Sequence, residues 1–347
     1  MPEITIKDVA RECGVGVSTV SRALNNHPDI NPATKAKILT VVEQLGFIPN
    51  NSARNLKRVE SNSIAVLIKG ISNPFFTEMI KIIESRVEEK GYDLVIHHVE
   101  SKENEVDVAL KLIKEKRLQG IIFLGGDFSH SDEKLGLINI PYVFSTAGLN
   151  PNQMKTSGYA YVSIDDLTES TKVVDYLIDM GHRRIAILSA QEEDRSVGNI
   201  RLNGYINALT RAGIEIDDNL ITKLPSGDMT EQYTMENGYR QTKELLAKKV
   251  PFTALYAISD TLAIGAMRAL REAGLNIPQQ VSVVGYDGIA IGDFANPRLS
   301  TLRQPVDEMA IATVDMLCDI IDGKRTNEQL LFSGELVVRE SSRAPLT

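Results

Sequence analysis

A short polar segment near the N-terminus carries side chains suited to contacting nucleic acid. Ser18, Thr19, Ser21, Arg22 and Asn25 stand close together in the chain. Hydroxyl and amide side chains stabilise an isolated helix poorly, but they donate readily to phosphate oxygens and base edges. An arginine such as Arg22 can form two hydrogen bonds with guanine, which contributes about 1–3 kcal/mol of discrimination between bases. The segment therefore predicts a surface that reads DNA.

Helix signals around this segment predict how it is positioned. Thr5 with Asp8 forms a capping pattern, Gly14 supplies a tight turn, and Asn31 followed by Pro32 opens a further helix. The expected helices cover residues 6–12, 17–24 and 32–45. Three short helices, the first two joined by a glycine turn, are typical of a helix-turn-helix.

The apolar residues of this region fit one small shared core. Ala10 is small where the first two helices must cross, and Cys13 is interpreted as a small buried residue without a redox role. The expected core residues are Val9, Cys13, Val15, Val20, Ala23, Ile38, Val41 and Leu45. A three-helix cap without DNA contacts is the alternative interpretation.

The charge of the chain is unevenly distributed. The 347 residues carry a formal net charge of −8, which by itself argues against a polyanionic partner. Residues 1–58, however, hold eight Lys and Arg against five Asp and Glu, so this part is +3 and the remainder −11. A basic module on an acidic body suggests a polyanion-binding head.

A basic segment follows the three helices. Residues 49–58 contain Arg54, Lys57 and Arg58 together with Leu56. The segment could form a short helix, although it is too short and polar to persist alone in water. An apolar side chain in a basic segment suits a wedge in the minor groove that kinks the duplex, whereas a plain linker with an incidental leucine is the alternative.

The N-terminal sequence resembles the lac/galactose repressor family of bacterial regulators. The resemblance rests on TIKDVARECGVGVSTVSRALN followed by LGFIPNNSARNLKR. It implies that Val17, Ser18 and Arg22 read bases in the major groove, and that Leu56 enters the operator centre as a symmetric pair. Gly16 and Val17 depart from the polar or longer residues common there. The expected DNA-contacting residues are Thr5, Gly16, Val17, Ser18, Thr19, Ser21, Arg22, Asn25, Ala53, Leu56 and Lys57.

From Ser61 onward, short apolar runs alternate with amphipathic helices. The expected strands are SIAVLI, YDLVIHH, GIIFLGG, PYVFS, YVSI, RRIAILS, TALYAIS, VSVVGYD and a final strand near 330–338. The expected helices lie near 74–91, 103–116, 166–180, 200–212, 236–247, 260–273 and 305–321. This alternation predicts parallel α/β sheets, and its two series predict two similar lobes.

The body resembles the remainder of the same family, which shares its body with periplasmic sugar-binding proteins. SNPFF, GHRRIAILS and IPQQVSVVGYDG occur in family order. The resemblance implies that Arg201 and Asp287 hold sugar hydroxyls and that Phe75 packs on the sugar ring. From the residues alone, Asp287 could be a turn aspartate and Asp260 a helix cap. The expected effector-binding residues are Phe75, Arg201, Asp287, Ser259, Arg195, Asp165 and Gln304.

Motifs for catalysis are missing from the sequence. No dinucleotide-binding glycine pattern follows a strand, no phosphate-binding loop or nucleophile elbow is present, and the five histidines lack zinc spacing. We therefore expect no enzyme activity, cofactor or metal. No apolar run is long enough to cross a membrane, and the N-terminus is charged without an apolar signal core, so we expect a cytoplasmic protein without a membrane partner.

These observations predict three parts: a helix-turn-helix head at 1–48, a hinge helix or linker at 49–60, and a two-lobed α/β body at 61–347 resembling periplasmic binding proteins. The expected function is a transcriptional regulator, expected to be a repressor, that binds a palindromic operator as a homodimer under allosteric control by a small molecule. A sugar or sugar derivative is the expected effector. A solute-binding protein for sugar uptake is the alternative.

Overall fold

The computed structural model divides the chain into two compact units, Met1–Ser61 and Asn62–Thr347. They are called the head and the body below. The structure describes residues 5–24, 29–45, 47, 62–100, 102–126, 132–148, 159–191, 196–224, 232–324 and 328–346. The expected hinge helix at 49–60 lies outside these residues.

The described part of the head contains three short helices. They are α1 (Ile6–Cys13), α2 (Val17–Leu24) and α3 (Pro32–Leu45). At the start of α1 the backbone N–H and the hydroxyl of Thr5 both donate to the Asp8 carboxylate, at 2.9 and 2.6 Å. The side chain of Asn31 accepts from the backbone of Ala33 at 2.9 Å and so caps α3. The expected helices and caps are therefore confirmed.

The α1–α2 turn and the core beneath it also follow the prediction. Gly14 ends α1 in the left-handed region, at φ 65°, a conformation that costs glycine little. The buried residues of the head are Val9, Ala10, Cys13, Val20, Ala23, Ile38 and Phe47, with Val15, Val41 and Leu45 packed partly buried against them. Since Val20 and Ala23 face this core, the opposite side of α2 is left for other contacts.

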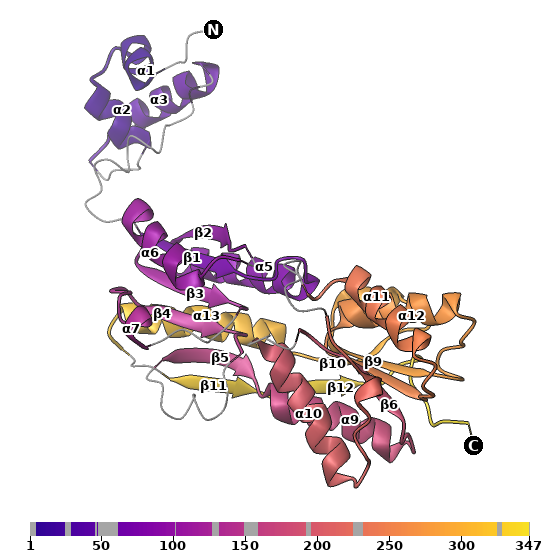
Figure 1. Ribbon diagram of the computed structural model, residues 1–347. Coiled ribbons are helices and arrows are strands. Elements are labelled where there is room, and N and C mark those ends of the chain that lie inside the picture. The colour runs from indigo at the N-terminus through magenta and orange to yellow at the C-terminus, as the bar shows by residue number, and fades with distance from the viewer. Residues whose placement is uncertain are drawn as a thin grey trace. The chain divides into compact units, whose positions relative to one another are not determined.

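The described part of the body contains two six-stranded sheets, each the centre of one lobe (Figure 1). Lobe I has the order β11-β5-β4-β3-β1-β2, and lobe II has the order β12-β10-β9-β8-β6-β7. The strands of lobe I are β1 (Ser63–Ile68), β2 (Asp93–His98), β3 (Gly120–Leu124), β4 (Tyr142–Ser145), β5 (Ala160–Ile164) and β11 (Gln329–Phe332). The strands of lobe II are β6 (Ile185–Leu188), β7 (Ile221–Thr222), β8 (Ala254–Ala257), β9 (Ser282–Asp287), β10 (Ser300–Arg303) and β12 (Glu335–Val337).

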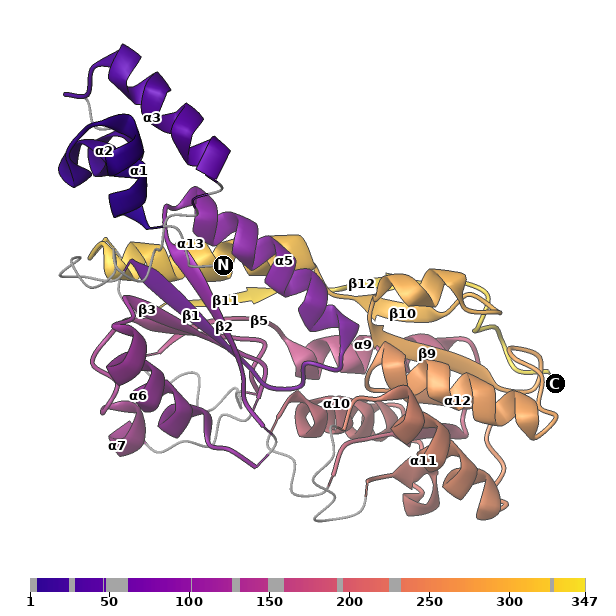
Figure 2. The same cartoon turned by 90° about the horizontal axis from the view of Figure 1, so that it is seen from above.

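Helices cover the faces of both sheets. Lobe I carries α5 (Pro74–Glu89), α6 (Glu105–Lys116), α7 (Asp132–Leu135) and α13 (Val306–Ile321). Lobe II carries α9 (Asp166–Asp179), α10 (Val197–Arg211), α11 (Met235–Ala247) and α12 (Asp260–Glu272), with short 3₁₀ turns η1 (Asp218–Leu220) and η2 (Ala290–Phe294). In lobe I, α5 and α13 lie side by side on one face of the sheet (Figure 2). Because helices cover both faces, the central strands are continuous apolar runs that are almost entirely buried.

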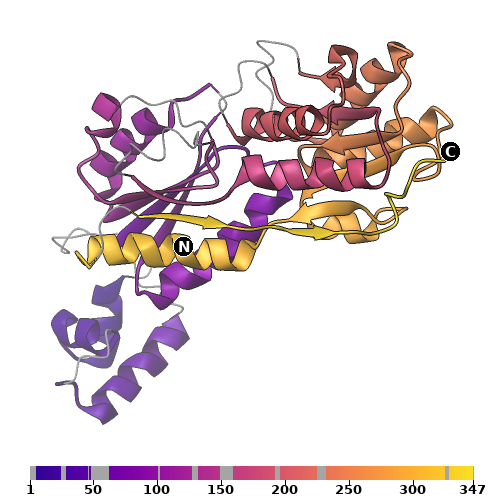
Figure 3. The ribbon, with the colours of Figure 1, turned by 90° about the horizontal axis from the view of Figure 1, so that it is seen from below.

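Between its described elements, the chain crosses from one lobe to the other three times. It passes from β5 into α9, from β10 into α13, and from β11 into β12. The final strand, expected as one piece near 330–338, is divided by Ser333 and Gly334 because its two halves join different sheets; Figure 3 shows them in yellow, running from one lobe to the other. All described pairings are parallel except that of β10 with β12. The two-lobed parallel α/β architecture is confirmed.

Among the described residues, no helix has the length and apolar character needed to cross a membrane.

Candidate functional site

The first candidate site is the outward face of α2 in the head. Val17, Ser18 and Arg22 are exposed there, and Thr19 and Ser21 are partly exposed. The turn residue Gly16 is exposed as well, while the opposite face of the helix is buried against α1 and α3. This face therefore presents the hydroxyl and guanidinium donors expected to contact DNA.

The other residues expected to contact DNA either make a contact within the head or lie outside the described residues. Thr5 caps α1, and its hydroxyl is engaged with Asp8. Asn25, Ala53, Leu56 and Lys57 lie outside the described residues. Their expected roles remain predictions.

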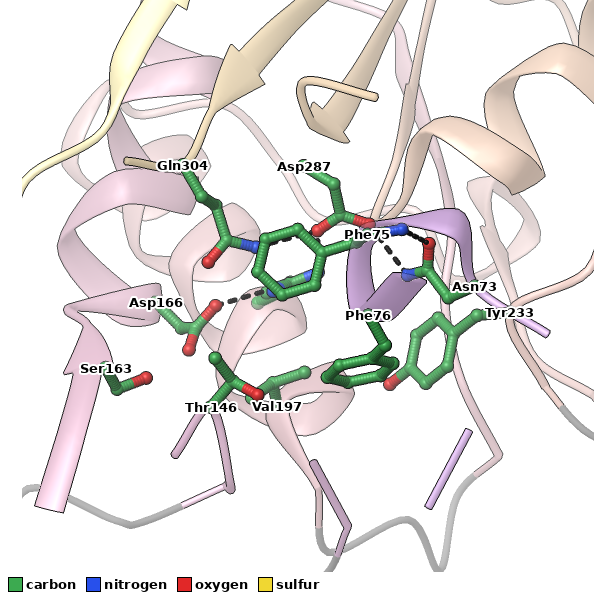
Figure 4. Close-up of a pocket in the computed structure, with 11 residues that line it drawn as sticks. Asn73, Phe75, Phe76, Thr146, Ser163, Asp166, Val197, Tyr233, Asp287 and Gln304 are labelled. Atoms are coloured by element: carbon green, nitrogen blue, oxygen red, sulfur yellow. Dashed lines mark hydrogen bonds and ion pairs between the residues drawn. The ribbon is translucent and has the colours of Figure 1, made fainter. Parts of the chain in front are cut away.

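The second candidate site is a pocket between the two lobes of the body, called the interlobe pocket. Figure 4 shows its lining side chains, which enclose about 360 Å³ of empty space, part of it open to solvent. The lining residues are Asn73, Phe75, Phe76, Thr146, Ser163, Asp166, Val197, Arg201, Tyr233, Asp287 and Gln304. The wall combines aromatic rings, neutral hydrogen-bonding groups and three charged groups.

The topology explains why these residues meet. Thr146 follows β4, Asp287 ends β9 and Gln304 follows β10, so all three lie at carboxyl ends of strands. Asn73 caps the helix after β1, and Arg201 lies near the start of α10. Parallel strands bring these ends together at one edge of each sheet, where ligands of α/β proteins bind. Two such edges face each other across the pocket.

Arg201 is the centre of a buried ionic network. Its Nε donates to Asp166 Oδ1 at 2.8 Å, and its Nη1 donates to the carbonyl of Ile258 at 2.7 Å and to Asp287 Oδ1 at 3.4 Å. The guanidinium lies 3.8 Å from the ring centroid of Tyr286, whose hydroxyl donates to Asp166 at 3.1 Å. Both carboxylates and the guanidinium are buried. The hydrogen bonds among them fix the orientation of all three side chains.

Asp287 projects from a strained turn that is fixed from behind. Its φ of 113° is outside the region that side-chain-bearing residues favour. The buried carboxylate of Asp260 accepts the N–H groups of Gly288 and Ile289, both at 2.8 Å, and the hydroxyl of Thr301 at 2.6 Å. These three bonds stabilise the turn, and the side chain of Asp287 that projects from it lines the pocket.

Burial and charge shift the pKa values of this network. Burial raises the pKa of Asp166 and of Asp287 against the opposing effect of Arg201. Burial alone would lower the pKa of Arg201, but the neighbouring Asp166 raises it well above its ordinary value, so the guanidinium stays charged. Burial, reinforced by the nearby charge of Asp287, raises the pKa of Asp260 to about 8.

Several buried oxygens of the pocket have no hydrogen-bond partner among the described residues. They are Thr146 Oγ1, Ser163 Oγ and Gln304 Oε1. Thr146 also has a φ of 54°, which is unusual for a β-branched residue. An unpaired buried polar atom costs roughly 1–3 kcal/mol, so a pocket that holds three of them is suited to polar groups of a ligand or to ordered water.

The structure brings together four of the expected effector-binding residues: Phe75, Arg201, Asp287 and Gln304. Ser259 and Asp165 are not among the described lining residues. Ser259 is buried at the N-cap of α12, where it accepts from Leu262, and Asp165 caps α9 by accepting from Thr168.

Arg195 lies outside the described residues. Its expected role in effector binding remains a prediction.

The remaining lining residues were not anticipated from the sequence. Asp166 follows the expected Asp165 directly, but the two side chains point in different directions at the start of α9. Asp165 caps the helix, whereas Asp166 accepts a hydrogen bond from Arg201. Ser163 could have been found, since it is a polar residue at the end of an otherwise apolar strand. Thr146 and Tyr233 lie in connecting segments without a distinctive pattern.

The head and body together define a class of protein, a helix-turn-helix head joined to a two-lobed α/β binding body. Residues 5–50 match the model of bacterial regulatory proteins of the lacI family, and residues 174–342 match the periplasmic binding protein-like domain. The chain belongs to the lacI family and is a transcriptional regulator that binds DNA.

Known proteins resemble the chain along its whole length. The HTH-type transcriptional regulator MalR of Clostridium butyricum is 37% identical over 340 residues, covering 97% of this chain and 99% of that protein. A lac repressor dimer bound to operator and the anti-inducer ONPF superposes with a TM-score of 0.78 at 26% identity, covering 99% and 100%. A complex of the transcriptional regulator CelR with cellobiose has a TM-score of 0.70 at 27% identity, covering 98% and 100%. The alternative of an uptake protein is therefore not favoured.

Proposed function

We propose that the chain is a repressor that binds a palindromic operator as a homodimer and is controlled by a sugar or sugar derivative bound in the interlobe pocket. The exposed face of α2 would read the major groove, with Val17, Ser18 and Arg22 in contact with bases. Such a regulator would act in the cytoplasm, where its operator is located, and its function requires no enzyme activity.

The observation that carries the proposal is the interlobe pocket itself. Asp287 and Asp166 are held in fixed orientation by Arg201, and three buried oxygens nearby have no partner among the described residues. Carboxylates with fixed geometry accept hydrogen bonds from neighbouring hydroxyls, and Phe75 offers a ring on which the apolar face of a sugar can pack. Among the solved relatives, CelR is in complex with cellobiose.

Effector control requires that the ligand distinguish two arrangements of the lobes. Three crossovers connect the lobes, and the pocket is lined from both, so a bound ligand changes the free energy of lobe closure. Lobe closure changes the affinity for the operator if it alters the separation of the two heads in the dimer. Coupling of this kind between two ligands is typically worth about 1–3 kcal/mol and is reciprocal.

An exposed apolar turn supports the homodimer. In η2, Phe294 is 86% exposed and Ile291 is 44% exposed. Adjacent exposed apolar side chains are suited to an interface with a partner when they form part of a larger apolar patch. A second copy suits this surface, because a palindromic operator has the two-fold symmetry of a dimer.

The test combines operator selection with ligand screening of the full-length chain. A binding site is first selected from random DNA duplexes, and a thermal-shift screen over sugars, sugar phosphates, nucleosides and purines then identifies ligands. We expect an enriched palindrome and a ligand that changes operator affinity by roughly 5- to 150-fold. Failure to enrich any sequence, or ligands that leave operator affinity unchanged, would contradict the proposal.

A further inference from the structure

The charge of the interlobe pocket is negative and is not neutralised by the one cation of its described wall. Asp166 and Asp287 face a single guanidinium, that of Arg201. Arg201 is already bonded to Asp166 and to the carbonyl of Ile258, and its flat face is covered by the ring of Tyr286. The positive charge of Arg201 is therefore already compensated by groups of the pocket wall.

A third carboxylate lies behind the wall. Asp260 holds the turn that carries Asp287, and the charge of Asp287 helps to raise the pKa of Asp260 to about 8. At neutral pH this group is therefore mainly protonated and adds little charge to the pocket. An anionic ligand would approach the carboxylates of Asp166 and Asp287 and a guanidinium that is already bonded to the wall.

Among the described lining residues, the hydrogen-bonding groups without a partner can all accept, and none of them can only donate. Gln304 donates its Nε2 to Asp287 at 2.8 Å, which fixes the amide so that its unpaired Oε1 is available to a ligand. None of the described residues donates to Oδ2 of Asp166. Thr146 and Ser163 offer hydroxyls that can donate or accept. Such a wall receives the O–H donors of a ligand, whereas phosphate and carboxylate groups require donors.

Aromatic rings form another part of the wall. Phe76 and Tyr233 lie near each other, and the ring of Phe75 lies between them and the polar groups of Asp166 and Gln304 (Figure 4). A sugar ring has C–H groups on one face and hydroxyls at its rim. This arrangement matches a ligand with one apolar face and a hydroxylated edge.

We propose that the interlobe pocket selects an uncharged polyhydroxyl ligand with an apolar face and rejects the phosphorylated or carboxylated form of that ligand. The inference rests on the proposed function, in which this pocket is the effector site. Coulomb repulsion at an effective dielectric constant of about 20 over several ångströms amounts to at least roughly a hundredfold weaker binding of the anion.

Matched ligand pairs test the selectivity with the full-length chain. The probes are glucose with glucose 6-phosphate and glucuronate, ribose with ribose 5-phosphate, cellobiose with its 6′-phosphate, and uridine with its monophosphate. Affinities come from thermal shift followed by isothermal titration calorimetry. A neutral ligand that binds at least a hundredfold tighter than its anionic partner supports the inference.

Two other outcomes separate the inference from the proposed function. An anionic member that binds as tightly as its neutral partner, or tighter, overturns the inference and leaves the sensor function intact. A chain that binds no member of either set contradicts the sensor function, and the inference falls with it.

A variant tests the electrostatic cause. Asp166→Asn keeps the shape of the side chain but removes one negative charge, so the preference for the neutral ligand should fall by about tenfold or more. Asp179→Asn is the matched control, because Asp179 is exposed in the last turn of the same helix and does not line the pocket. An unchanged preference in folded Asp166→Asn would overturn the charge-based account, and Asp287→Asn serves the same purpose if Asp166→Asn does not fold.

Discussion

The Nδ2 of Asn73 in lobe I donates to Oδ2 of Asp287 in lobe II at 2.9 Å, so one buried hydrogen bond joins the two lobes directly across the pocket. The other end of the Asn73 side chain caps α5, since its Oδ1 accepts from Phe75 at 3.1 Å. The carboxylate expected to hold the effector is thus already engaged. A ligand that bonds to Asp287 must replace or share this bond.

We predict that Asn73→Asp destabilises the contact between the lobes, because it keeps an oxygen for the helix cap but places a second carboxylate against Asp287. The expected loss is roughly 1–3 kcal/mol, the cost of a buried charged acceptor without its donor. Thermal denaturation of the variant measures it. Asn73→Ser is the control, since serine also caps helices and also removes the amide donor to Asp287 but adds no charge, so the difference between the two variants measures the effect of the second carboxylate. A melting temperature of Asn73→Asp equal to that of Asn73→Ser would contradict the prediction.

We predict that Asp260 makes the stability of the body depend on pH. Its folded-state pKa of about 8 lies above its ordinary value of 3.8, so the folded state binds an additional proton between these pH values. The stability that this proton contributes is complete below about pH 4 and is lost as the pH rises toward 8. Chemical unfolding between pH 5 and 8.5 should therefore show wild type losing more stability with rising pH than Asp260→Asn does.

The same variant should cost little at low pH. There Asp260 is protonated, and a neutral carboxyl resembles an amide in having one accepting oxygen and one donating group, so Asp260→Asn should match wild type to within about 1 kcal/mol. Parallel pH profiles for the two proteins would show that Asp260 does not titrate in this range.

We predict that Arg22→Ala weakens binding to the selected operator by about 1–3 kcal/mol and leaves binding to unrelated DNA nearly unchanged. The reason is that base contacts discriminate between sequences, while phosphate contacts do not. Fluorescence anisotropy with operator and scrambled duplexes at fixed salt measures both. The control is Arg11→Ala, because Arg11 is exposed on α1 and paired with Asp8. Equal losses of affinity for both duplexes would indicate that Arg22 contacts phosphates and not bases.

We predict that Phe294→Asp shifts the chain from dimer to monomer, because it places a charge in the exposed apolar turn η2. Sedimentation velocity at micromolar concentration measures the change. Leu137→Asp provides the comparison, since Leu137 is also largely exposed, at 61%, but lies in lobe I after α7. A dimer that persists in Phe294→Asp would place the interface elsewhere.

Local patterns predicted most of the elements because each depends on neighbouring residues. Capping by Thr5 and Asn31, the glycine turn at Gly14, and runs such as residues 63–68 are short-range signals, and the structure places helices and strands there. The strand near 330–338 was predicted as one piece because its apolar pattern is continuous. Its division at Gly334 depends on which sheet each half joins, which is a long-range property.

The sequence by itself determined the three-helix head, the two α/β lobes and the presence of Arg201 and Asp287 at positions suited to a ligand. Only the tertiary structure decided that Asp166 rather than Asp165 meets Arg201, that Asp260 supports Asp287 from behind, and that Asn73 bonds to Asp287 across the pocket. The reason is physical. Helix and strand propensities act over a few residues, whereas Asn73 and Asp287 are separated by 214 positions and meet only because two sheets present their carboxyl edges to each other.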